Sequence, residues 1–151
     1  MVKIAFGCKM GVGKSHASSY ILRKLGGGVK LAFADPLYDI LLYAQDKCKF
    51  QKIKDRKFLQ FIGTEWAREY DDSVWVNLLI ENSNILGCTH QVLEDLRFPN
   101  EFEALKQNGW ICIKITRSGN GSKRHRSETS LDILSDKRWD YVCLLYTSPS
   151  P

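Results

Sequence analysis

Apolar residues along the chain fall into two patterns that alternate from one end to the other. Short β-prone apolar runs predict strands, and apolar residues three or four positions apart predict helices between them. The predicted strands are residues 2–6, 29–34, 91–93, 110–115 and 141–145. The predicted helices are residues 14–25, a helix from 35 onwards, 58–66, 74–86, 99–108 and a short one at 128–134. Strands separated by helical crossovers indicate an α/β fold with a parallel sheet.

The predicted helix near residue 35 has both a start signal and an apolar face. Asp35 is suited to cap this helix, and Pro36 is suited to its first turn. The side chains expected on its buried face are Leu37, Ile40, Leu41 and Ala44. Three glycines at residues 26–28 end the preceding helix. Because Asp35 and Pro36 follow the second predicted strand, we expect a helix to begin directly after that strand.

Composition narrows the class of protein. The chain has 151 residues, of which 44% are hydrophobic and 26% charged, as in a single soluble globular domain. Its five cysteines include no CxxC pair and its three histidines have no metal-ligand spacing, so we expect a reduced protein without a metal cage. No apolar run reaches the roughly 18 residues of a membrane span, and the N-terminus lacks a signal-peptide layout. These features predict a cytoplasmic protein with no membrane partner.

The net charge of +5 is concentrated in two segments. Residues 47–57 and residues 114–126 each carry a net charge of +5, which leaves −5 on the rest of the chain. Two basic segments on an acidic body indicate loops that meet small anions rather than a nucleic-acid-binding stripe. For the first segment, solvated helix faces are an equally good interpretation.

The first predicted strand-to-helix turn, residues 7–15, carries the strongest chemical signal. Gly11 and Gly13 allow backbone N–H groups to approach a phosphate at a helix N-terminus. Lys14 can reach the β- and γ-phosphates of a nucleotide, and Ser15 offers a hydroxyl to Mg²⁺. This combination predicts a phosphate-binding loop of the Walker A type.

One position of this loop departs from the usual pattern, because Cys8 replaces the first glycine and Gly7 stands one place early. The chain has no NKxD segment for reading guanine and is too short for a mechanical ATPase with its accessory domains. A compact phosphoryl-transfer enzyme remains, and such an enzyme needs positive charge around the transferred group. The arginines available for this are Arg56, Arg68, Arg97, Arg117, Arg124 and Arg126.

Six segments in order along the chain resemble those of the bacteriophage-type deoxynucleoside monophosphate kinases, a group of P-loop nucleotide kinases. The segments are residues 9–15, 33–37, 56–65, 66–68, 95–101 and 125–128. The resemblance covers residues 2–142, and the ordered set is far more selective than the phosphate loop alone. It implies a three-layer P-loop NTPase fold of the nucleoside monophosphate kinase type, with a mostly parallel five-stranded sheet.

The resemblance also implies an activity, the in-line transfer of the ATP γ-phosphate to a deoxynucleoside 5′-monophosphate. ATP and Mg²⁺ are the implied cofactors. The residues implied to hold ATP are Lys9, Met10, Gly11, Val12, Gly13, Lys14, Ser15 and Arg117. Lys14 is also implied in catalysis, and Ser15 and Asp95 are the implied magnesium ligands. A helix cap before Pro99 is the alternative role of Asp95.

Arg68 and Arg97 are the implied catalytic residues on the acceptor side, because guanidinium groups match phosphate oxygens. Arg68 could instead pair with Glu65 on its own helix. The full set implied for the acceptor is Asp35, Arg56, Gln60, Thr64, Arg68 and Arg97. Gln60 and Thr64 lie one helical turn apart, so we expect them to share a face.

Residues 117–127 resemble a lid that closes over both phosphates and excludes water. Arg124 and Arg126 are the implied catalytic residues of this lid, and Arg117 lies at its start. A basic surface loop is the alternative interpretation.

Two other functions stay open at this stage. The first is another small-molecule P-loop kinase, similar to the shikimate, gluconate or phosphomevalonate kinases, because these enzymes share the fold. The second is a non-enzymatic nucleic-acid-binding module that uses the two basic segments. We expect no nucleic-acid partner, because the charge is better matched to a small nucleotide. A homodimer is left open, and the host cytoplasm is the expected location if the protein is viral.

The end of the chain departs from the resemblance. The kinase domain is expected to cover residues 1–146, after which the family continues through a further turn and a closing helix. Residues 147–151 instead resemble translated sequencing-adapter read-through, which predicts a truncated or chimeric reading frame with a non-native or disordered tail. A natural short tail is the alternative.

Overall fold

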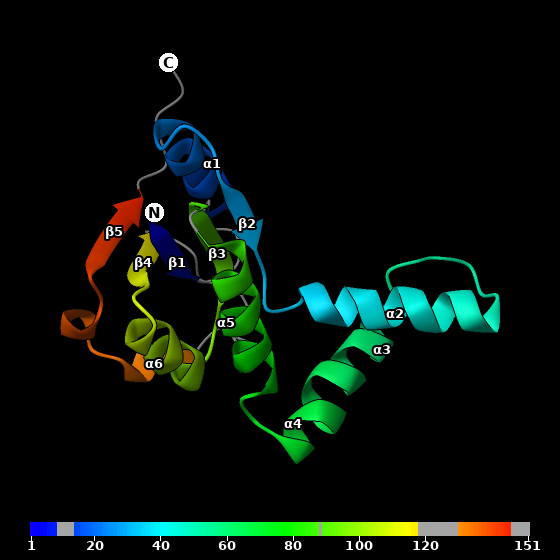
Figure 1. The fold of residues 1–151 in the computed structure, drawn as a ribbon. Coiled ribbons are helices and arrows are strands. Elements are labelled where there is room, and N and C mark those ends of the chain that lie inside the picture. Colours follow the sequence, from blue (N-terminus) through cyan, green and yellow to red (C-terminus); the bar gives the residue numbers. More distant parts are fainter. Residues whose placement is uncertain (9–13, 88, 118–129, 146–151) are drawn as a thin grey trace.

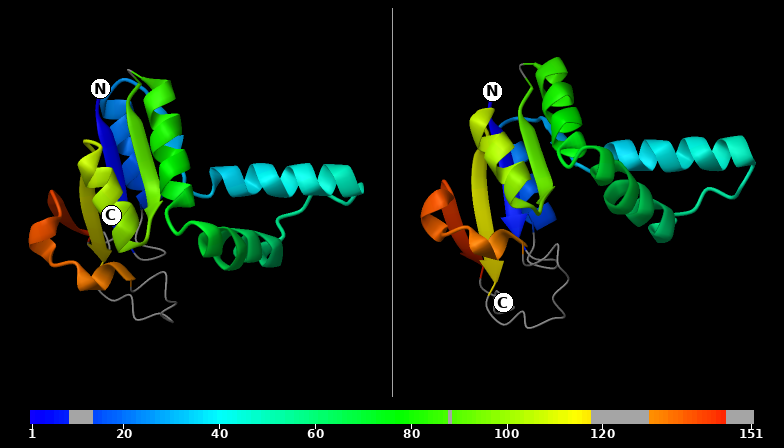
Figure 2. Two further views of the ribbon diagram at one scale, coloured as in Figure 1. Left: turned by 60° about the horizontal axis from the view of Figure 1, so that its bottom comes forward. Right: turned by 90° about the horizontal axis from the view of Figure 1, so that it is seen from below.

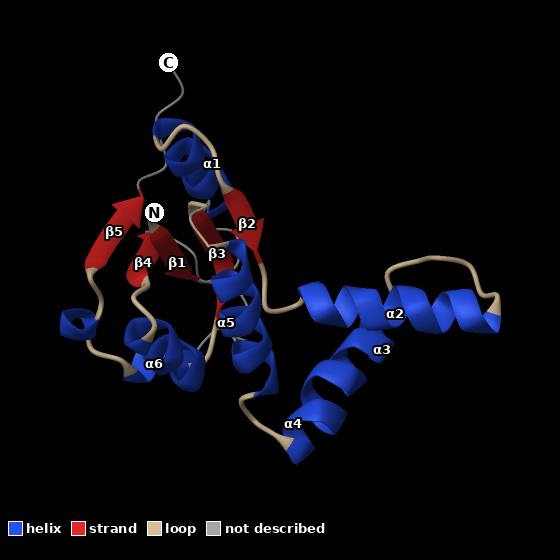
Figure 3. Cartoon of the chain, in the orientation of Figure 1, coloured by secondary structure: helices blue, strands red, loops and turns tan. Residues whose placement is uncertain are grey.

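A parallel sheet forms the centre of the protein. The computed structural model describes residues 1–8, 14–87, 89–117 and 130–145. In these residues the five strands lie in the order β2-β3-β1-β4-β5, and each neighbouring pair is parallel (Figure 3). The strands are β1 (Lys3–Cys8), β2 (Val29–Leu31), β3 (Gln91–Leu96), β4 (Ile111–Arg117) and β5 (Tyr141–Leu145). The predicted α/β fold with its five-stranded parallel sheet is confirmed.

Helices cover both faces of the sheet and make a three-layer arrangement (Figure 1). One helix, α1, packs on one face, while α5 and α6 pack on the other. These helices are α1 (Lys14–Lys24), α5 (Val74–Leu86) and α6 (Pro99–Gln107). Two short 3₁₀ helices, η2 (Ser130–Ile133) and η3 (Asp136–Arg138), precede β5.

The alternation of side chains along β1 contributes to two cores, one on each face of the sheet. In β1, Ile4 and Phe6 point to the α1 side, whereas Ala5 points to the side of α5 and α6. The second core is the larger, and its buried members include Leu79, Leu93, Leu96, Phe102, Leu105, Trp110 and Trp139. Burying each such aliphatic or aromatic side chain contributes about 1.5–3 kcal/mol. These two cores fix the carboxyl ends of β1 and β3, where the candidate chemistry lies.

A helical arm, defined here as residues 35–70, projects from the edge of the sheet next to β2 (Figure 2). Its elements are α2 (Asp35–Cys48), α3 (Arg56–Gln60), a π-helical segment η1 (Phe61–Trp66) and α4 (Ala67–Tyr70). The last three run on from one another, α3 packs against α2, and η1 meets α2 where Gly63 lies against Leu37. At this contact a Cβ on Gly63 would lie 2.9 Å from Leu37 Cδ1, so only glycine fits there without a shift.

Several predicted boundaries were wrong. The second strand ends at Leu31 instead of residue 34, because carboxylates bind the backbone amides of residues 32–34. The third strand continues to Leu96, beyond the predicted residue 93. Helix α2 begins at Asp35 itself, and its cap residue, Ala34, makes no side-chain cap hydrogen bond. Ile40 was expected on the buried face of this helix but is 38% exposed.

The remaining expectations on organisation concern the membrane and the tail. Across the described segments, every helix is too short or too polar to cross a membrane. Strand β5 occupies the predicted residues 141–145. The expected tail, residues 147–151, and most of the expected lid lie outside the described residues.

Candidate functional site

The phosphate-loop prediction falls at the carboxyl end of a central strand. Strand β1 ends at Cys8 and α1 begins at Lys14, so the predicted strand-to-helix context is confirmed. Lys14 and Ser15 form the start of α1, where free backbone N–H groups favour an anion. The other predicted ATP-binding residues of the loop, Lys9, Met10, Gly11, Val12 and Gly13, lie outside the described residues.

Gly7 has a packing role that its displaced position in the motif did not indicate. It lies inside β1 and pairs with Lys114 of β4 and Leu96 of β3. A Cβ at this position would lie 2.2 Å from the ring of Trp139 and 3.2 Å from Leu131. Gly7 therefore leaves room for the buried Trp139 to pack against the strand that precedes the predicted phosphate loop.

The acid that contacts the start of α1 is Glu94, which the sequence analysis did not select. Ser15 Oγ donates a hydrogen bond of 3.1 Å to Glu94 Oε2. Lys30 Nζ lies 3.1 Å from Glu94 Oε1 and donates to Ser19 Oγ at 3.0 Å. Burial acts to raise the pKa of Glu94, but hydrogen bonds from Ser18, Lys30 and Ser15 outweigh it and hold the pKa below the usual value. Glu94 is therefore ionised at neutral pH.

Asp95, the predicted magnesium ligand, contacts the backbone between β2 and α2 rather than the start of α1. Its Oδ1 accepts from the amide of Phe33 at 3.1 Å and its Oδ2 from the amide of Ala34 at 3.4 Å. Burial raises its pKa, although these amides and the charge of Arg97 oppose the shift. Asp95 thus hydrogen-bonds to the backbone that connects β2 to the helical arm. Its alternative role as a helix cap is not seen, since the cap residue of α6 is Phe98, and its predicted role as a magnesium ligand stays a prediction.

Ser15 lies in contact with Glu94, whereas Asp95, the other predicted magnesium ligand, binds backbone amides at the start of the helical arm. Mg²⁺ prefers hard oxygen ligands and is usually held by one or two protein groups plus phosphates and water. The hydroxyl of Ser15 and the carboxylate of Glu94 are such donors, and Glu94 Oε1 also lies 3.1 Å from Lys30 Nζ. Within the described segments no cluster of three or more His, Cys, Asp or Glu forms a protein-only metal cage.

A cavity of about 1010 Å³ lies between the arm and the segment that follows β3. Four of the six predicted acceptor residues line it, namely Gln60, Thr64, Arg68 and Arg97. A smaller hollow of about 230 Å³ shares Thr64, Arg68 and Arg97 with it and reaches Asp95 and Glu101. The structure therefore brings both predicted phosphate-binding arginines into one place.

The π-helical segment η1 lies on the side of the arm that lines this cavity. In η1 the turn is wider by one residue, which is a local distortion often found at functional sites. The carbonyl of Gly63 accepts a 2.8 Å hydrogen bond from Trp75 Nε1, which connects the arm to helix α5. Gln60 and Thr64 both line the cavity, so the prediction that they share a face is confirmed.

Arg68 is held by three neighbouring groups. Its Nη2 lies 3.3 Å from Glu101 Oε1, and its Nη1 donates to the carbonyl of Asp72 at 3.2 Å. Its guanidinium also lies over the ring of Phe98, 4.8 Å from the ring centroid. The alternative partner, Glu65, lines the same cavity, but the described hydrogen bonds and ion pairs of Arg68 go to Glu101 and Asp72.

Glu101 is a buried acid that the sequence analysis gave no role. Its Oε2 accepts the backbone amides of Arg97 at 3.0 Å and Phe98 at 3.1 Å, and so caps α6. Burial raises its pKa to about 7, against those amides and the charge of Arg68, which favour the carboxylate.

This acid makes stability depend on pH. In the unfolded chain the pKa of Glu101 returns to 4.5 from about 7, so between these values the native state binds more protons. The stability that Glu101 contributes to the folded state is present at low pH and is lost as the pH rises through 7. We expect the unfolding free energy of the wild type, relative to Glu101→Gln, to fall by about 2 kcal/mol from about pH 5 to about pH 8. Urea denaturation of both chains measures this, and a pH-independent difference would show that Glu101 titrates normally.

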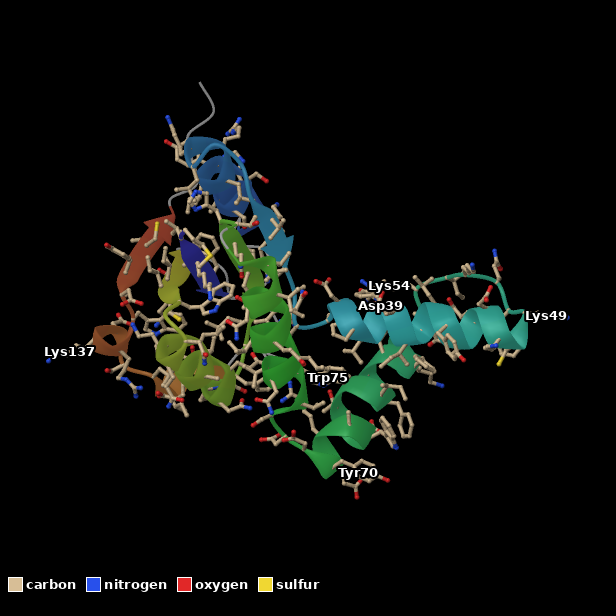
Figure 4. All side chains as sticks on the ribbon, in the orientation of Figure 1. Asp39, Lys49, Lys54, Tyr70, Trp75 and Lys137 are labelled. Atoms are coloured by element: carbon tan, nitrogen blue, oxygen red, sulfur yellow. The ribbon has the colours of Figure 1, made fainter. Side chains whose placement is uncertain are left out.

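The other two predicted acceptor residues lie elsewhere. Asp35 lines a separate hollow of about 330 Å³ with Asp39 and Trp75, and its Oδ2 accepts the amide of Ala32 at 3.0 Å. Figure 4 shows Asp39 on α2 and Trp75 where the arm meets α5. Arg56 is exposed in the first turn of α3 and lines none of these three hollows. The expectation that both belong to the acceptor site therefore gains no support from geometry.

The two basic segments differ in their surroundings. The first, residues 47–57, lies on the arm, with Lys49 at the outer end of α2 (Figure 4). In the second, Lys114 pairs with Asp136 at 2.8 Å. Arg117 is the last residue of β4, and Arg124 and Arg126 lie outside the described residues. The predicted roles of these three arginines stay predictions.

Two viral proteins are similar to this chain. It is 31% identical over 175 aligned positions to the "Putative deoxynucleotide monophosphate kinase" of Acanthamoeba polyphaga mimivirus, an alignment that covers 94% of this chain and 87% of that protein. It is 35% identical over 140 positions to the uncharacterized protein ORF77 of Ictalurid herpesvirus 1 (strain Auburn). That second alignment covers 88% of this chain but only 60% of the herpesvirus protein. No protein-family model matches the chain.

Among solved structures, a gluconokinase from Sinorhizobium meliloti 1021 has the same fold. The TM-score is 0.51 at 14% sequence identity, and the match covers 99% of this chain and 84% of that structure. At this identity the likeness bears on the fold alone. It agrees with the order and direction of the five strands.

Proposed function

We propose that this chain, which belongs to the P-loop kinase family of the mimivirus protein, phosphorylates deoxynucleoside 5′-monophosphates with ATP. Kinase chemistry is the family-level activity, while the acceptor, the bacteriophage-type subgroup and the role of each site residue are parts of the proposal. The printed name of the mimivirus relative supports a nucleotide acceptor.

The strand register is the observation that carries the proposal. Strands β1 and β3 are parallel neighbours, and Gly7 is paired with Leu96. Arg97, one residue further, therefore lies beside the strand end that leads to the phosphate loop. The same Arg97 lines the cavity that contains Arg68, Gln60 and Thr64. A phosphate on Lys14 and a second phosphate on the two arginines would then meet across the end of the sheet.

In the proposed reaction, an oxygen of the acceptor phosphate attacks the γ-phosphorus of ATP. A new P–O bond forms as the bond to the β–γ bridging oxygen breaks, and ADP leaves with the electron pair. Lys14 and the N–H groups at the start of α1 bind the donor phosphates, and Arg68 and Arg97 orient the acceptor phosphate. Ser15 and Glu94 would hold Mg²⁺, which supplies charge neutralisation between the phosphates when bound. The wide cavity leaves room for a nucleoside beside Gln60 and Thr64.

A panel of acceptors tests the proposal. Purified protein is incubated with MgATP and each of the four deoxynucleoside monophosphates, their ribose counterparts, gluconate or shikimate, and ADP release is followed. We expect at least one deoxynucleotide to exceed the two non-nucleotide acceptors in kcat/KM by about a thousandfold, because those lack a phosphate for Arg68 and Arg97. Preferential turnover of gluconate or shikimate would instead support a small-molecule kinase.

A further inference from the structure

Glu101 lies in the acceptor cavity, although the proposed transfer assigns it no task. It belongs to the first turn of α6 and is only 2% exposed. One oxygen accepts the amides of Arg97 and Phe98, while the other lies 3.3 Å from Arg68 Nη2. A single carboxylate therefore links the arm to the segment after β3. These are the two segments that supply the proposed phosphate-binding arginines.

The contacts of Arg68 indicate that its orientation is set in advance. An arginine side chain loses about 2 kcal/mol of rotamer entropy when it is fixed. Here Glu101, the Phe98 ring and the Asp72 carbonyl restrain the guanidinium on three sides. The side chain of Arg68 is nevertheless 17% exposed and lines both hollows, so part of it faces the space where an acceptor would lie.

We propose that Glu101 is a positioning residue, whose carboxylate fixes the Arg68 guanidinium and the Arg97 backbone in the orientation that receives the acceptor phosphate. This inference rests on the proposed function, in which Arg68 and Arg97 hold that phosphate. Acceptor binding then depends on Glu101, and it does so through Arg68.

Stability alone does not account for this buried acid. Burial disfavours the ionised form of Glu101, so at alkaline pH the carboxylate works against folding. A glutamine could cap α6 with its amide oxygen and would avoid that cost. A glutamine could not hold Arg68, because its NH₂ group would face the guanidinium donors. The ionised carboxylate is thus specifically suited to the arginine.

Glu101→Gln isolates this link, because it keeps an oxygen for the two amides. At about pH 8, where Glu101 is ionised, we expect the acceptor KM to rise about tenfold, with kcat and the KM for ATP changed by less than about threefold. Glu103→Gln is the matched control, because Glu103 lies on the same helix and pairs with Arg138 away from the cavity. The control is expected to keep wild-type KM values. An unchanged acceptor KM in Glu101→Gln would overturn the proposal.

A double-mutant cycle separates positioning from a general structural role. In an Arg68→Ala background, Glu101→Gln should add almost nothing to the acceptor KM, because the arginine it positions is absent. If Glu101→Gln raised the acceptor KM by the same factor in both backgrounds, the two residues would act independently and the proposal would be wrong.

A binding measurement keeps this inference distinct from the proposed function. In a Lys14→Ala background, which weakens anion binding at the phosphate loop, titration with inorganic phosphate is followed by the shift in Tm. We expect phosphate to stabilise this chain, and to do so at about tenfold higher concentration when Glu101→Gln or Arg68→Ala is added. The same phosphate dependence in all variants, or no stabilisation at all, would overturn the positioning role. A positive result without deoxynucleotide turnover would leave the role intact and contradict only the proposed acceptor.

Discussion

Replacing Lys14 with alanine is expected to lower kcat for phosphoryl transfer by about a thousandfold or more, while the chain stays folded. Lys14 is the first residue of α1 and is not buried, so its loss removes positive charge without opening a core. The transferred phosphate then lacks the ammonium that stabilises its charge. Steady-state ADP release and a thermal melt of the same preparation measure the two quantities.

Lys24→Ala is the matched control for this experiment. Lys24 is the last residue of the same helix, is exposed and lies over the ring of Tyr20. We expect this variant to keep wild-type turnover within about twofold, since its charge lies at the end of α1 remote from the predicted loop. A Lys14→Ala enzyme as active as Lys24→Ala would exclude the phosphate loop as the donor site.

Gly7→Ala is expected to destabilise the fold by about 3 kcal/mol and to weaken ATP binding. The new Cβ would lie 2.2 Å from the Trp139 ring, which is itself packed edge-on against Phe102 at 4.8 Å. The indole and the end of β1 must therefore move apart. Because β1 ends at Cys8, directly before the predicted phosphate loop, the shift should also disturb the residues proposed to bind ATP.

Relief of this overlap gives a direct check. Trp139→Leu alone removes packing and should destabilise the chain, but it also removes the ring atoms that Gly7→Ala would meet. The double variant should then be more stable than the sum of the two single effects predicts, by about 1 kcal/mol or more. Urea denaturation of the four chains gives this coupling, and strictly additive effects would show that Gly7 has no packing role.

The parallel sheet could be predicted from the sequence because each strand is a short apolar run followed by a helical pattern. The ends of strands were harder to predict, because side chains decide them. Residues 32–34 look like a continuing strand in sequence, but Asp35 and Asp95 bind their amides and end β2 at Leu31. Asp95 is 62 positions from Phe33 and 61 positions from Ala34 along the chain, so its role at this strand end could not be read from the local sequence.

The neighbouring acids Glu94 and Asp95 show a second limit. Consecutive residues of a regular strand point to opposite faces of the sheet, and the contacts of Glu94 and Asp95 show that Glu94 is the one that meets α1. Val92 packs on the α1 side, and Glu94, two positions on, points the same way and contacts Ser15. The sequence did not indicate this, because Val92 and Leu93 are equally apolar. The register of β3 against β1 also shifts between Leu93 and Leu96, which both lie in the larger core, so strict alternation does not continue through Asp95.

The residues of the proposed acceptor site were predictable in part. Gln60 and Thr64 were placed correctly by helical spacing. The partner of Arg68 was not, because local spacing favours Glu65 whereas the fold brings in Glu101 from 33 positions away. Arg56 belongs to the same sequence motif as Gln60 and Thr64, but it is exposed in the first turn of α3 and does not line the cavity. Asp35 lies on α2 and lines a separate hollow.

Direct identification of the products tests the central claim most sharply. Protein, MgATP and a deoxynucleoside monophosphate are incubated, and the nucleotides are separated by anion-exchange chromatography. We expect a deoxynucleoside diphosphate to accumulate in an amount equal to the ADP formed, and neither product to appear with Lys14→Ala. ADP formed without any diphosphate, or equal conversion by Lys14→Ala, would contradict transfer between the phosphate loop and the arginine-lined cavity.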